Sequence, residues 1–335
     1  MDRRVFLKTA LAGSAVVGAG LGGRAAASGE VRSLSAGASH LALGPGVRGV
    51  RFRASGRWTR WQAAQSCSAG DDAGRVARGS LVAMPGDASA YEVEGPSGGT
   101  GEVVARAPGG TARSTQDSFV LGQKQVPCTY LSRREWGADE SLRFGPDGAE
   151  AYPQTFHPVQ ALTVHHSAIA VGPDPAADLR AIYRFHTVNQ DFGDVGYHLL
   201  IDPLGTVYEG RVSGGDAGPV FGPGRDERNR LLMSNAAHVG GHNAGNVGVC
   251  LMGDFTSAGP GDAARRSLVL VLAALCEVTG VDPLGEVDYV NPIGGAAKRV
   301  RGISGHQDWM ATGCPGKTFY PALDEVRRQV AAALA

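Results

Sequence analysis

The sequence predicts an α/β domain with a central mixed β-sheet flanked by helices, preceded by a small all-β domain. From about residue 120 onward, short apolar runs alternate with helical segments, which is typical of a sheet covered by helices. Before that point, short runs of alternating apolar and polar residues are separated by glycine and proline, as in small β-sandwiches and barrels. The 335-residue chain is long enough for both units. We expect the β domain at residues 36–107, a linker at 108–120 and the α/β domain at 121–335.

The first residues have the pattern of an export signal. Arg3 and Arg4 precede an apolar stretch over residues 9–22, and three alanines at 25–27 provide a small-residue cleavage site. A membrane anchor is the alternative, but the apolar stretch is shorter than the roughly 20 residues that a spanning helix needs. We therefore predict a twin-arginine signal peptide at residues 1–27 and export through that pathway.

Charge and composition are those of an ordinary soluble domain. The chain has 32 basic and 32 acidic residues, with 43% hydrophobic and 19% charged residues. Residues 1–27 contain four basic residues and one acid, so the remainder has a net charge of −3. Nucleic-acid binding needs a clustered basic face, and the sequence contains no such cluster. We therefore expect no nucleic-acid partner and no membrane span after signal removal.

The cysteine count is odd, which in an exported protein leaves one thiol unpaired. A metal ligand would account for the extra thiol. Two of the cysteines flank the domain junction and could pair, but the sequence does not fix the connectivity. The five are Cys67, Cys128, Cys250, Cys276 and Cys314, and the junction pair is Cys67 with Cys128.

In the β domain, residues 47–53, 91–94 and 102–105 are expected to form strands because apolar and polar residues alternate there. Trp58 and Trp61 lie three positions apart. They could stack on a sugar, although a pair of core or edge aromatics is the favoured interpretation.

The α/β domain is predicted element by element from periodicity and turn residues. Two of the strands are joined by a proline-glycine turn into a hairpin, which makes the sheet mixed. Residues 212–235, rich in glycine, proline and arginine, are expected to form a long loop over one face. The expected elements are a strand at 161–165, a helix at 177–189, hairpin strands at 198–202 and 206–211, a strand at 247–253, and helices at 262–278 and 320–334.

Residues with metal-binding side chains occur in two places. His306 and Cys314 lie eight positions apart in a glycine-rich loop, and His165 and His166 end the first strand of the α/β domain. Two imidazoles and one thiolate would form a zinc site with one position left for water, as in catalytic rather than structural sites. Adjacent strand residues point to opposite faces, so spacing does not choose between the two strand histidines.

Five sequence blocks, in this order, resemble the N-acetylmuramoyl-L-alanine amidase family of peptidoglycan recognition proteins, which includes the phage T7-type lysozymes. The resemblance covers roughly residues 130–335. The blocks are Ser132-Arg133-Arg134-Glu135-Trp136-Gly137-Ala138, Val164-His165-His166-Ser167-Ala168, Asp194-Val195-Gly196-Tyr197-His198-Leu199-Leu200-Ile201, residues 238–254, and Gly305-His306-Gln307-Asp308 with Cys314-Pro315-Gly316.

The resemblance assigns roles to individual residues. It implies that His165, His306 and Cys314 hold Zn²⁺. Tyr197 matches the family's catalytic tyrosine, and a phenol with an ordinary pKa near 10 is better suited to orienting water or stabilising an oxyanion than to acting as a base. Thr312 falls where relatives carry Lys or Thr, which implies a second hydrogen bond to the tetrahedral intermediate.

The resemblance also places a substrate groove. His238 and Asn243 lie in the segment that resembles it, while His242 departs from the aromatic residue of many relatives. His166 is assigned to substrate binding, with support of the metal ligands as the alternative. The remaining histidines are expected to pack or to lie at the surface, with one facing into the structure. They are His40, His157 and His186, and the inward-facing one is His198.

The resemblance implies a zinc-dependent amidase that uses zinc-bound water to hydrolyse the amide between N-acetylmuramic acid and L-alanine of peptidoglycan. The protein would be secreted or cell-wall associated, with the β domain tuning wall attachment or access to the groove. The alternative is a non-catalytic peptidoglycan-binding module of the same fold, but recognition-only relatives typically lack the cysteine, so Cys314 favours the enzyme. A serine hydrolase is a remote third hypothesis, because the α/β domain contains no Gly-x-Ser-x-Gly motif.

Overall fold

A six-stranded mixed sheet forms the centre of the larger domain. The computed structural model describes residues 30–65, 72, 79–105, 116–214 and 218–335. All neighbouring strands of this sheet are parallel except one antiparallel hairpin, β14–β15, which confirms the predicted mixed sheet. The strands, in spatial order, are β11 (Tyr130–Leu131), β15 (Val207–Glu209), β14 (Leu199–Ile201), β18 (Asn246–Leu251), β13 (Ala161–His166) and β21 (Ile303–Gly305).

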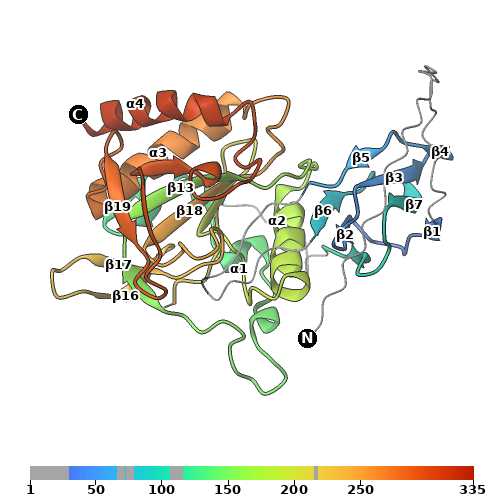
Figure 1. The fold of residues 1–335 in the computed structure, drawn as a ribbon, viewed down its shortest axis with the longest axis horizontal. Coiled ribbons are helices and arrows are strands. Elements are labelled where there is room, and N and C mark those ends of the chain that lie inside the picture. The colour runs from blue at the N-terminus through green and yellow to red at the C-terminus, as the bar shows by residue number, and fades with distance from the viewer. Residues whose placement is uncertain (1–29, 66–71, 73–78, 106–115, 215–217) are drawn as a thin grey trace, which may run out of the picture.

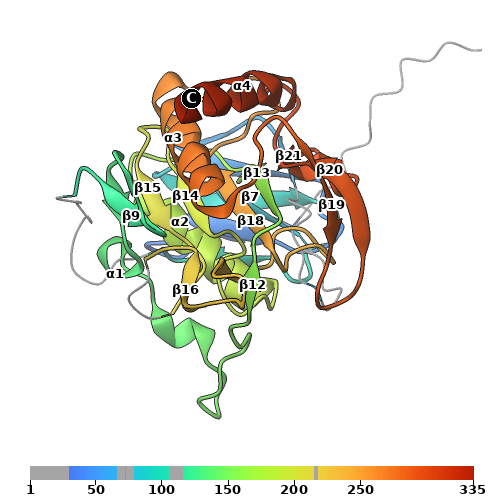
Figure 2. The same cartoon turned by 90° about the vertical axis from the view of Figure 1, so that its left-hand side faces the viewer.

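Helices cover both faces of this sheet (Figures 1 and 2). The helices α3 (Asp262–Thr279) and α4 (Leu323–Leu334) lie on one face, and α2 (Pro175–Arg184) lies on the other with the short α1 (Arg133–Trp136). Side chains alternate along each strand, so the two faces supply two separate apolar cores. The strand β18, for example, contributes Val247, Val249 and Leu251 to the α3 side and Cys250 to the α2 side.

Most predicted elements are present with shifted ends. The expected helix at 177–189 is α2 followed by a π-helical turn, η2 (Phe185–Asn189). The closing helix begins as a 3-10 turn, η4 (Tyr320–Ala322), before α4.

The predicted loop at residues 212–235 is wrong in part. It contains a hairpin of β16 (Phe221–Arg225) and β17 (Leu231–Ser234), which pairs with β12 (Phe156–Pro158). The Asp226 carboxylate accepts hydrogen bonds from the backbone N–H groups of Arg228 and Arg230 at 3.0 and 2.8 Å and so closes the turn. The turn residues therefore mark a hairpin rather than an unstructured insertion.

Short elements outside the central sheet complete this domain. Two further hairpins flank it, and two short 3-10 helices follow α1 and β21. They are β9 (Phe119–Leu121) with β10 (Lys124–Val126), β19 (Glu286–Val290) with β20 (Ala297–Arg301), η1 (Glu140–Arg143) and η3 (His306–Asp308).

The N-terminal region is all β, as predicted. It has a five-stranded and a three-stranded sheet around a core that includes Leu41, Val50, Phe52 and Tyr91. The first sheet contains β1 (Arg32–Ser33), β7 (Ala88–Glu94), β3 (Gly49–Ala54), β4 (Arg57–Trp58) and β5 (Gln62–Ala63), and the second contains β6 (Ser80–Ala83), β2 (His40–Leu43) and β8 (Gly101–Val103).

The tryptophan pair lies at the edge of the first sheet. Trp58 and Trp61 are 36% and 42% exposed, and the guanidinium of Arg51 lies 4.9 and 4.8 Å from the two ring centroids. These are edge aromatics that contact a cation, in keeping with the favoured interpretation.

The two domains share one of the apolar cores. Leu81 and Val103 of the N-terminal domain belong to the same buried cluster as Leu179 and Ile182 of α2. A hydrogen bond also crosses this interface, from Arg180 Nε to Ala105 O at 3.2 Å. The buried Nε2 of His40 lies 3.1 Å from Asp178 Oδ1 but without hydrogen-bond geometry. The outer side of α2 is thus covered by the N-terminal domain (Figure 1).

Several sequence predictions fall outside the described residues. These are the signal peptide at 1–27 and Cys67. Cys128, the other half of the suggested junction pair, is a buried free cysteine, and so is Cys276. Burial raises the pKa of both thiols, that of Cys276 to about 12. Within the described ranges, no helix combines the length and the apolar character that crossing a bilayer requires.

A buried histidine links the central sheet to the strands β12, β16 and β17. His198 is fully buried, Gly248 N–H donates to its Nδ1 at 2.9 Å, and its Nε2 lies 2.7 Å from the carbonyl of Ser234. A carbonyl only accepts, so Nε2 carries the proton and the ring is neutral. Burial disfavours the charged ring and lowers the pKa of His198 to about 4. A proton on Nδ1 would also displace the hydrogen bond from Gly248 N–H.

Because His198 is buried in its neutral form, we expect the protein to lose stability in mild acid. The unfolded chain binds a proton at His198 near pH 6.5, whereas the folded chain resists it down to about pH 4. The free energy of unfolding should therefore fall as the pH drops from about 6.5 to 4, by at most roughly 3 kcal/mol from this residue. Urea unfolding with EDTA at several pH values, for the wild type and for His198→Gln, measures it. Equal losses in both proteins over this window would contradict the assignment.

Candidate metal centre

Three residues with metal-binding side chains meet at the carboxyl end of the central sheet. His165 lies near the end of β13, while His306 and Cys314 belong to the segment after β21. The strands β13 and β21 are parallel, and Val164 pairs with Gly305, so the following residues of both strands lie side by side. The ligand atoms of the three side chains all lie within 4.8 Å of one another, and each side chain is at most 1% exposed.

This arrangement fits a bound metal ion. Both ring nitrogens of His306 are buried and have no hydrogen-bond partner among the described residues. An unsatisfied buried imidazole is costly, and a coordinated cation removes that cost for one of its nitrogens. Cys314 Sγ lies 3.6 Å from His165 Nδ1, so a sulfur and an imidazole nitrogen face the same point. Two histidines and one cysteine match the ligands that zinc prefers and leave one coordination position open.

A chain of hydrogen bonds fixes the tautomer of His165. Its Nε2 lies 3.0 Å from His238 Nδ1, and His238 Nε2 lies 2.9 Å from the carbonyl oxygen of Asn246. The carbonyl can only accept, so His238 is protonated on Nε2 and accepts from His165 Nε2 through Nδ1. The lone pair of His165 Nδ1 is thereby directed toward Cys314.

Burial keeps His238 neutral, and a glycine on β18 lets its ring lie close to the sheet. It is fully buried, and burial with the neighbouring imidazoles lowers its pKa well below the usual value. Gly248 permits this approach, because a Cβ there would lie 2.7 Å from the His238 ring. The sequence analysis placed His238 in the substrate groove, whereas its contacts are those of a residue that orients a metal ligand.

Backbone groups surround the sulfur of Cys314. The N–H of His166 donates to Sγ at 3.3 Å, which favours the thiolate form. The imidazole of His166 points to the opposite face, where Nδ1 accepts from Phe255 N–H at 3.2 Å. His166, assigned to substrate binding in the sequence analysis, is 3% exposed and supports the sulfur through its backbone.

The two residues assigned to catalysis lie beside the metal ligands. The ring of Tyr197 is 5.1 Å from that of His165, centroid to centroid, and the side chain is 1% exposed. Thr312 is half-buried, and its Oγ1 accepts from Cys314 N–H at 3.2 Å. Both therefore border the three ligands.

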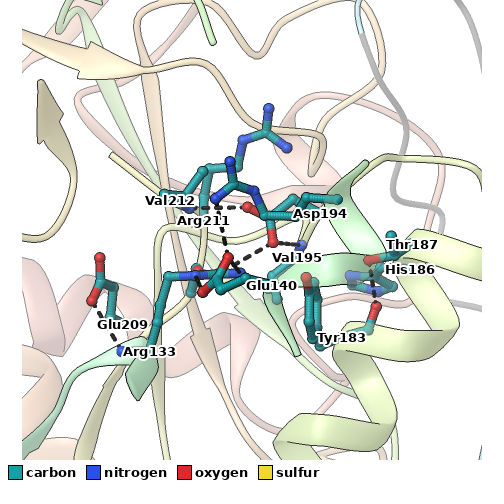
Figure 3. Close-up of polar contacts among 12 residues, drawn as sticks. Arg133, Glu140, Tyr183, His186, Thr187, Asp194, Val195, Glu209, Arg211 and Val212 are labelled. Carbon is teal, nitrogen blue, oxygen red and sulfur yellow. Dashed lines mark hydrogen bonds and ion pairs between the residues drawn. The ribbon is translucent and has the colours of Figure 1, made fainter. Parts of the chain in front are cut away.

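A buried ion pair positions the segment that carries Tyr197 (Figure 3). Arg133 Nη1 lies 3.0 Å from Asp194 Oδ1, and both side chains are at most 6% exposed. Asp194 also accepts from the backbone N–H groups of Val195 and Val212 at 2.7 and 3.0 Å. Burial opposes the charge of Arg133, but the carboxylates of Asp194 and Glu140 raise its pKa above the usual value.

The Arg133–Asp194 ion pair gives a structural role to the sequence block at residues 132–138, which contains no metal ligand. The segment Ser132–Trp136 is far from the metal ligands in sequence, yet its arginine fixes the turn that leads to Tyr197, and Arg211 N–H donates to Tyr197 O at 2.7 Å. The block therefore contributes a positioning residue rather than a metal ligand.

The predicted groove segment contains a polar cluster. Asn243 Oδ1 accepts from the backbone N–H groups of His238 and Val239 at 2.8 and 2.7 Å, which fixes the bend of this segment. His242, where many relatives carry an aromatic residue, packs against the rings of Tyr289 and Trp309, with ring centroids 5.8 and 5.4 Å away.

Three further residues of this cluster were missed by the sequence analysis. Asn235 and Asn291 each direct a side-chain amide to the carboxylate of Asp72, which belongs to the N-terminal domain. No local motif marks these residues, because Asp72 and Asn291 are 219 positions apart.

The other histidines lie away from the metal ligands. His40 is buried at the domain interface, and His157 is half-buried in β12. His186 is buried and accepts from Gly196 N–H at 3.1 Å through Nδ1. These three are packing residues of the fold.

Comparison with known proteins places this site in a family. Residues 155–317 match the family described as N-acetylmuramoyl-L-alanine amidase. Human N-acetylmuramoyl-L-alanine amidase is 29% identical over 171 residues, which are 50% of this chain and 24% of the human protein. The chain thus spans about a quarter of that relative's length.

Smaller proteins are aligned over most of their length. Peptidoglycan-recognition protein SD of Drosophila simulans is 27% identical over 209 residues, which are 61% of this chain and 87% of that protein. A crystal structure of the Drosophila peptidoglycan recognition protein SD is 23% identical, covers 58% of this chain and 93% of that one, and has a TM-score of 0.42. Residues 155–317 of this chain thus form a domain of the N-acetylmuramoyl-L-alanine amidase family.

Proposed function

We propose that this protein is a zinc-dependent amidase that hydrolyses the amide between N-acetylmuramic acid and L-alanine of peptidoglycan. The observation that carries the proposal is the cluster of His165, His306 and Cys314, in which both nitrogens of a buried histidine have no partner among the described residues. Family membership supplies the reaction class.

The ligand set suits hydrolysis. In a site with three protein ligands, zinc lowers the pKa of a bound water to about 7 and polarises a carbonyl oxygen. Neutral His165 and His306 would hold the ion with the Cys314 thiolate, which His166 N–H stabilises. His238 keeps His165 in the ligating tautomer.

Two side chains would act on the reacting groups. The hydroxyl of Tyr197 would donate a hydrogen bond to the water or to the oxygen that becomes negative in the transition state. Thr312 Oγ1 accepts from Cys314 N–H, which leaves its own proton to donate to the same oxygen. The Arg133–Asp194 ion pair would hold the tyrosine in place.

Peptidoglycan is the proposed partner, and we propose that the protein reaches it by export. Residues 1–27 carry the pattern of a twin-arginine signal, so we propose export followed by secretion or association with the cell wall. A non-catalytic peptidoglycan-binding module is the second candidate, and Cys314 argues against it because the cysteine completes the ligand set.

Replacing the cysteine tests the enzyme against the binding module. Cys314→Ser should lose zinc and stem-peptide release together, because serine is a poor zinc ligand at neutral pH. The measurements are metal content of the purified protein and release of stem peptides from purified peptidoglycan. Zinc in the wild type without release from several wall types would favour the binding module, and absence of zinc would contradict the metal centre. Cys276→Ser, a buried thiol away from the site, is the control.

Replacing the tyrosine separates catalysis from metal binding. Tyr197→Phe keeps the packing of the ring and removes only the hydroxyl, so kcat should fall by roughly a hundredfold or more while zinc content stays unchanged. Steady-state kinetics on a soluble muropeptide, with metal analysis, measures both. An unchanged kcat would exclude the hydroxyl from the reaction.

Replacing the supporting histidine weakens the metal site. His238→Gln removes the acceptor that fixes the His165 tautomer, so zinc affinity should fall by roughly 10–100-fold. Competition with a chelator measures the affinity. His242→Gln, the same change at a ring that does not contact His165, should leave it unaltered. Equal affinities in the two variants would show that the hydrogen bond does not support the metal.

A further inference from the structure

A carboxylate of the N-terminal domain lies in the groove segment of the amidase domain. Asp72, between β5 and β6, accepts at Oδ1 from Asn243 N–H at 3.0 Å and from the side-chain amides of Asn243 and Asn291 at 3.3 and 2.8 Å. Its Oδ2 accepts from Asn235 Nδ2 at 3.1 Å. Four hydrogen bonds from one domain therefore converge on a single carboxylate of the other.

The donors are held in place by the amidase domain itself. Asn235, Asn243 and Asn291 are at most 1% exposed. Asn291 Nδ2 also donates to Gly241 O at 2.7 Å, and Asn235 Nδ2 donates to Tyr152 OH at 3.0 Å. Side chains fixed in this way form a preorganised carboxylate site rather than one shaped by its occupant.

Asp72 satisfies this site incompletely. Asn235 Oδ1 is buried and has no hydrogen-bond partner among the described residues. A carboxylate offers only acceptors, so it cannot supply the missing donor. A peptide stem carries both carboxylates and N–H groups. It could therefore accept from the asparagine amides and donate to Asn235 Oδ1. The donors are also uncharged, and within the described part of the chain Asp72 forms no ion pair, which favours an exchangeable contact.

The carboxylate site is connected to the metal ligands. Asn243, which donates to Asp72, accepts from His238 N–H, and His238 contacts His165. The carboxylate site and the metal ligands are thus joined through the single residue His238.

The metal ligands and the tyrosine beside them are deeply buried, since all four side chains are at most 1% exposed. Gln65 of the N-terminal domain lines a cavity of about 20 Å³ with Tyr197 and His186, and its Nε2 donates to Asp254 Oδ2 at 3.2 Å. A cavity of this size holds one water molecule, so the N-terminal domain leaves little free space beside Tyr197.

We propose that the N-terminal domain inhibits the amidase by placing Asp72 in a site that binds a carboxylate of the peptide stem. This inference rests on the proposed function for the identity of the competing ligand. Substrate binds only when Asp72 has left, so the apparent affinity is reduced by the fraction of molecules in the open state.

The test compares two variants of the full zinc-loaded protein. Asp72→Ala removes the inhibiting carboxylate, while Asp87→Ala removes an exposed carboxylate of the same domain whose hydrogen bond within the described ranges is to Ser55. The probe is the tripeptide L-alanyl-γ-D-glutamyl-L-lysine, which lacks the muramyl amide and is not cleaved. Calorimetry should show about tenfold tighter binding to Asp72→Ala than to the wild type, and no change for Asp87→Ala. The gain should vanish with a fully amidated tripeptide.

A second readout does not depend on catalysis. Zinc removal by a chromogenic chelator should be several-fold faster in Asp72→Ala, because the metal becomes accessible. Asp72→Asn, which keeps one acceptor oxygen, should fall between the wild type and Asp72→Ala and serves if the alanine variant does not fold.

The outcomes separate inhibition from a purely structural contact and from a failure of the proposed function. Unchanged tripeptide affinity and chelation rate, with a lower free energy of unfolding, would overturn the inference, because Asp72 would then only join the two domains. Tighter binding and faster chelation without stem-peptide release by any variant would support the inhibitory contact and overturn the amidase proposal instead.

Discussion

The candidate metal centre depends on the parallel pairing of β13 with β21. This pairing aligns Val164 with Gly305 and so brings His165 next to His306, although the two segments are far apart in the chain. The opposite edge of β13 pairs with β18 over its whole length. A shift of β13 by one residue would turn His165 toward the helices α3 and α4 and would bury a polar ring among apolar side chains. The apolar core on that face therefore fixes the register, and the register fixes the ligands.

A continuous chain of hydrogen bonds lies behind the metal ligands. His165 contacts His238, which contacts the carbonyl of Asn246, and each ring has a defined tautomer. His306 differs, because neither of its nitrogens has a hydrogen-bond partner among the described residues. Binding of a metal would thus complete the hydrogen-bonding and coordination of this region, so metal affinity and the stability of the amidase domain are coupled.

The sequence predicted those features that depend on local patterns. Alternation and turn residues indicated the mixed sheet and the hairpin of β14 and β15. Residue chemistry indicated His306, Cys314 and one of two adjacent histidines as metal ligands, and the family resemblance selected His165. Spacing could not choose between His165 and His166, and the reason is now visible, because one faces the metal ligands and the other faces Phe255. The contacts of Asp72 were out of reach, since they join segments that share no periodicity. The hairpin inside residues 212–235 was missed because its turn-forming residues resemble those of a loop.

The helix α2 has apolar contacts on both sides, one toward the central sheet and one toward Leu81 and Val103 of the N-terminal domain. A protein with such a helix does not separate cleanly into two parts. Cutting the chain between the domains would leave the halves associated, as in a nicked protein, because the apolar contact persists without the covalent bond. Expressing the amidase domain alone would expose the side of α2 that the N-terminal domain covers and favour aggregation or self-association. Any relief of inhibition in the cell would thus require a local movement around Asp72 rather than the loss of a domain.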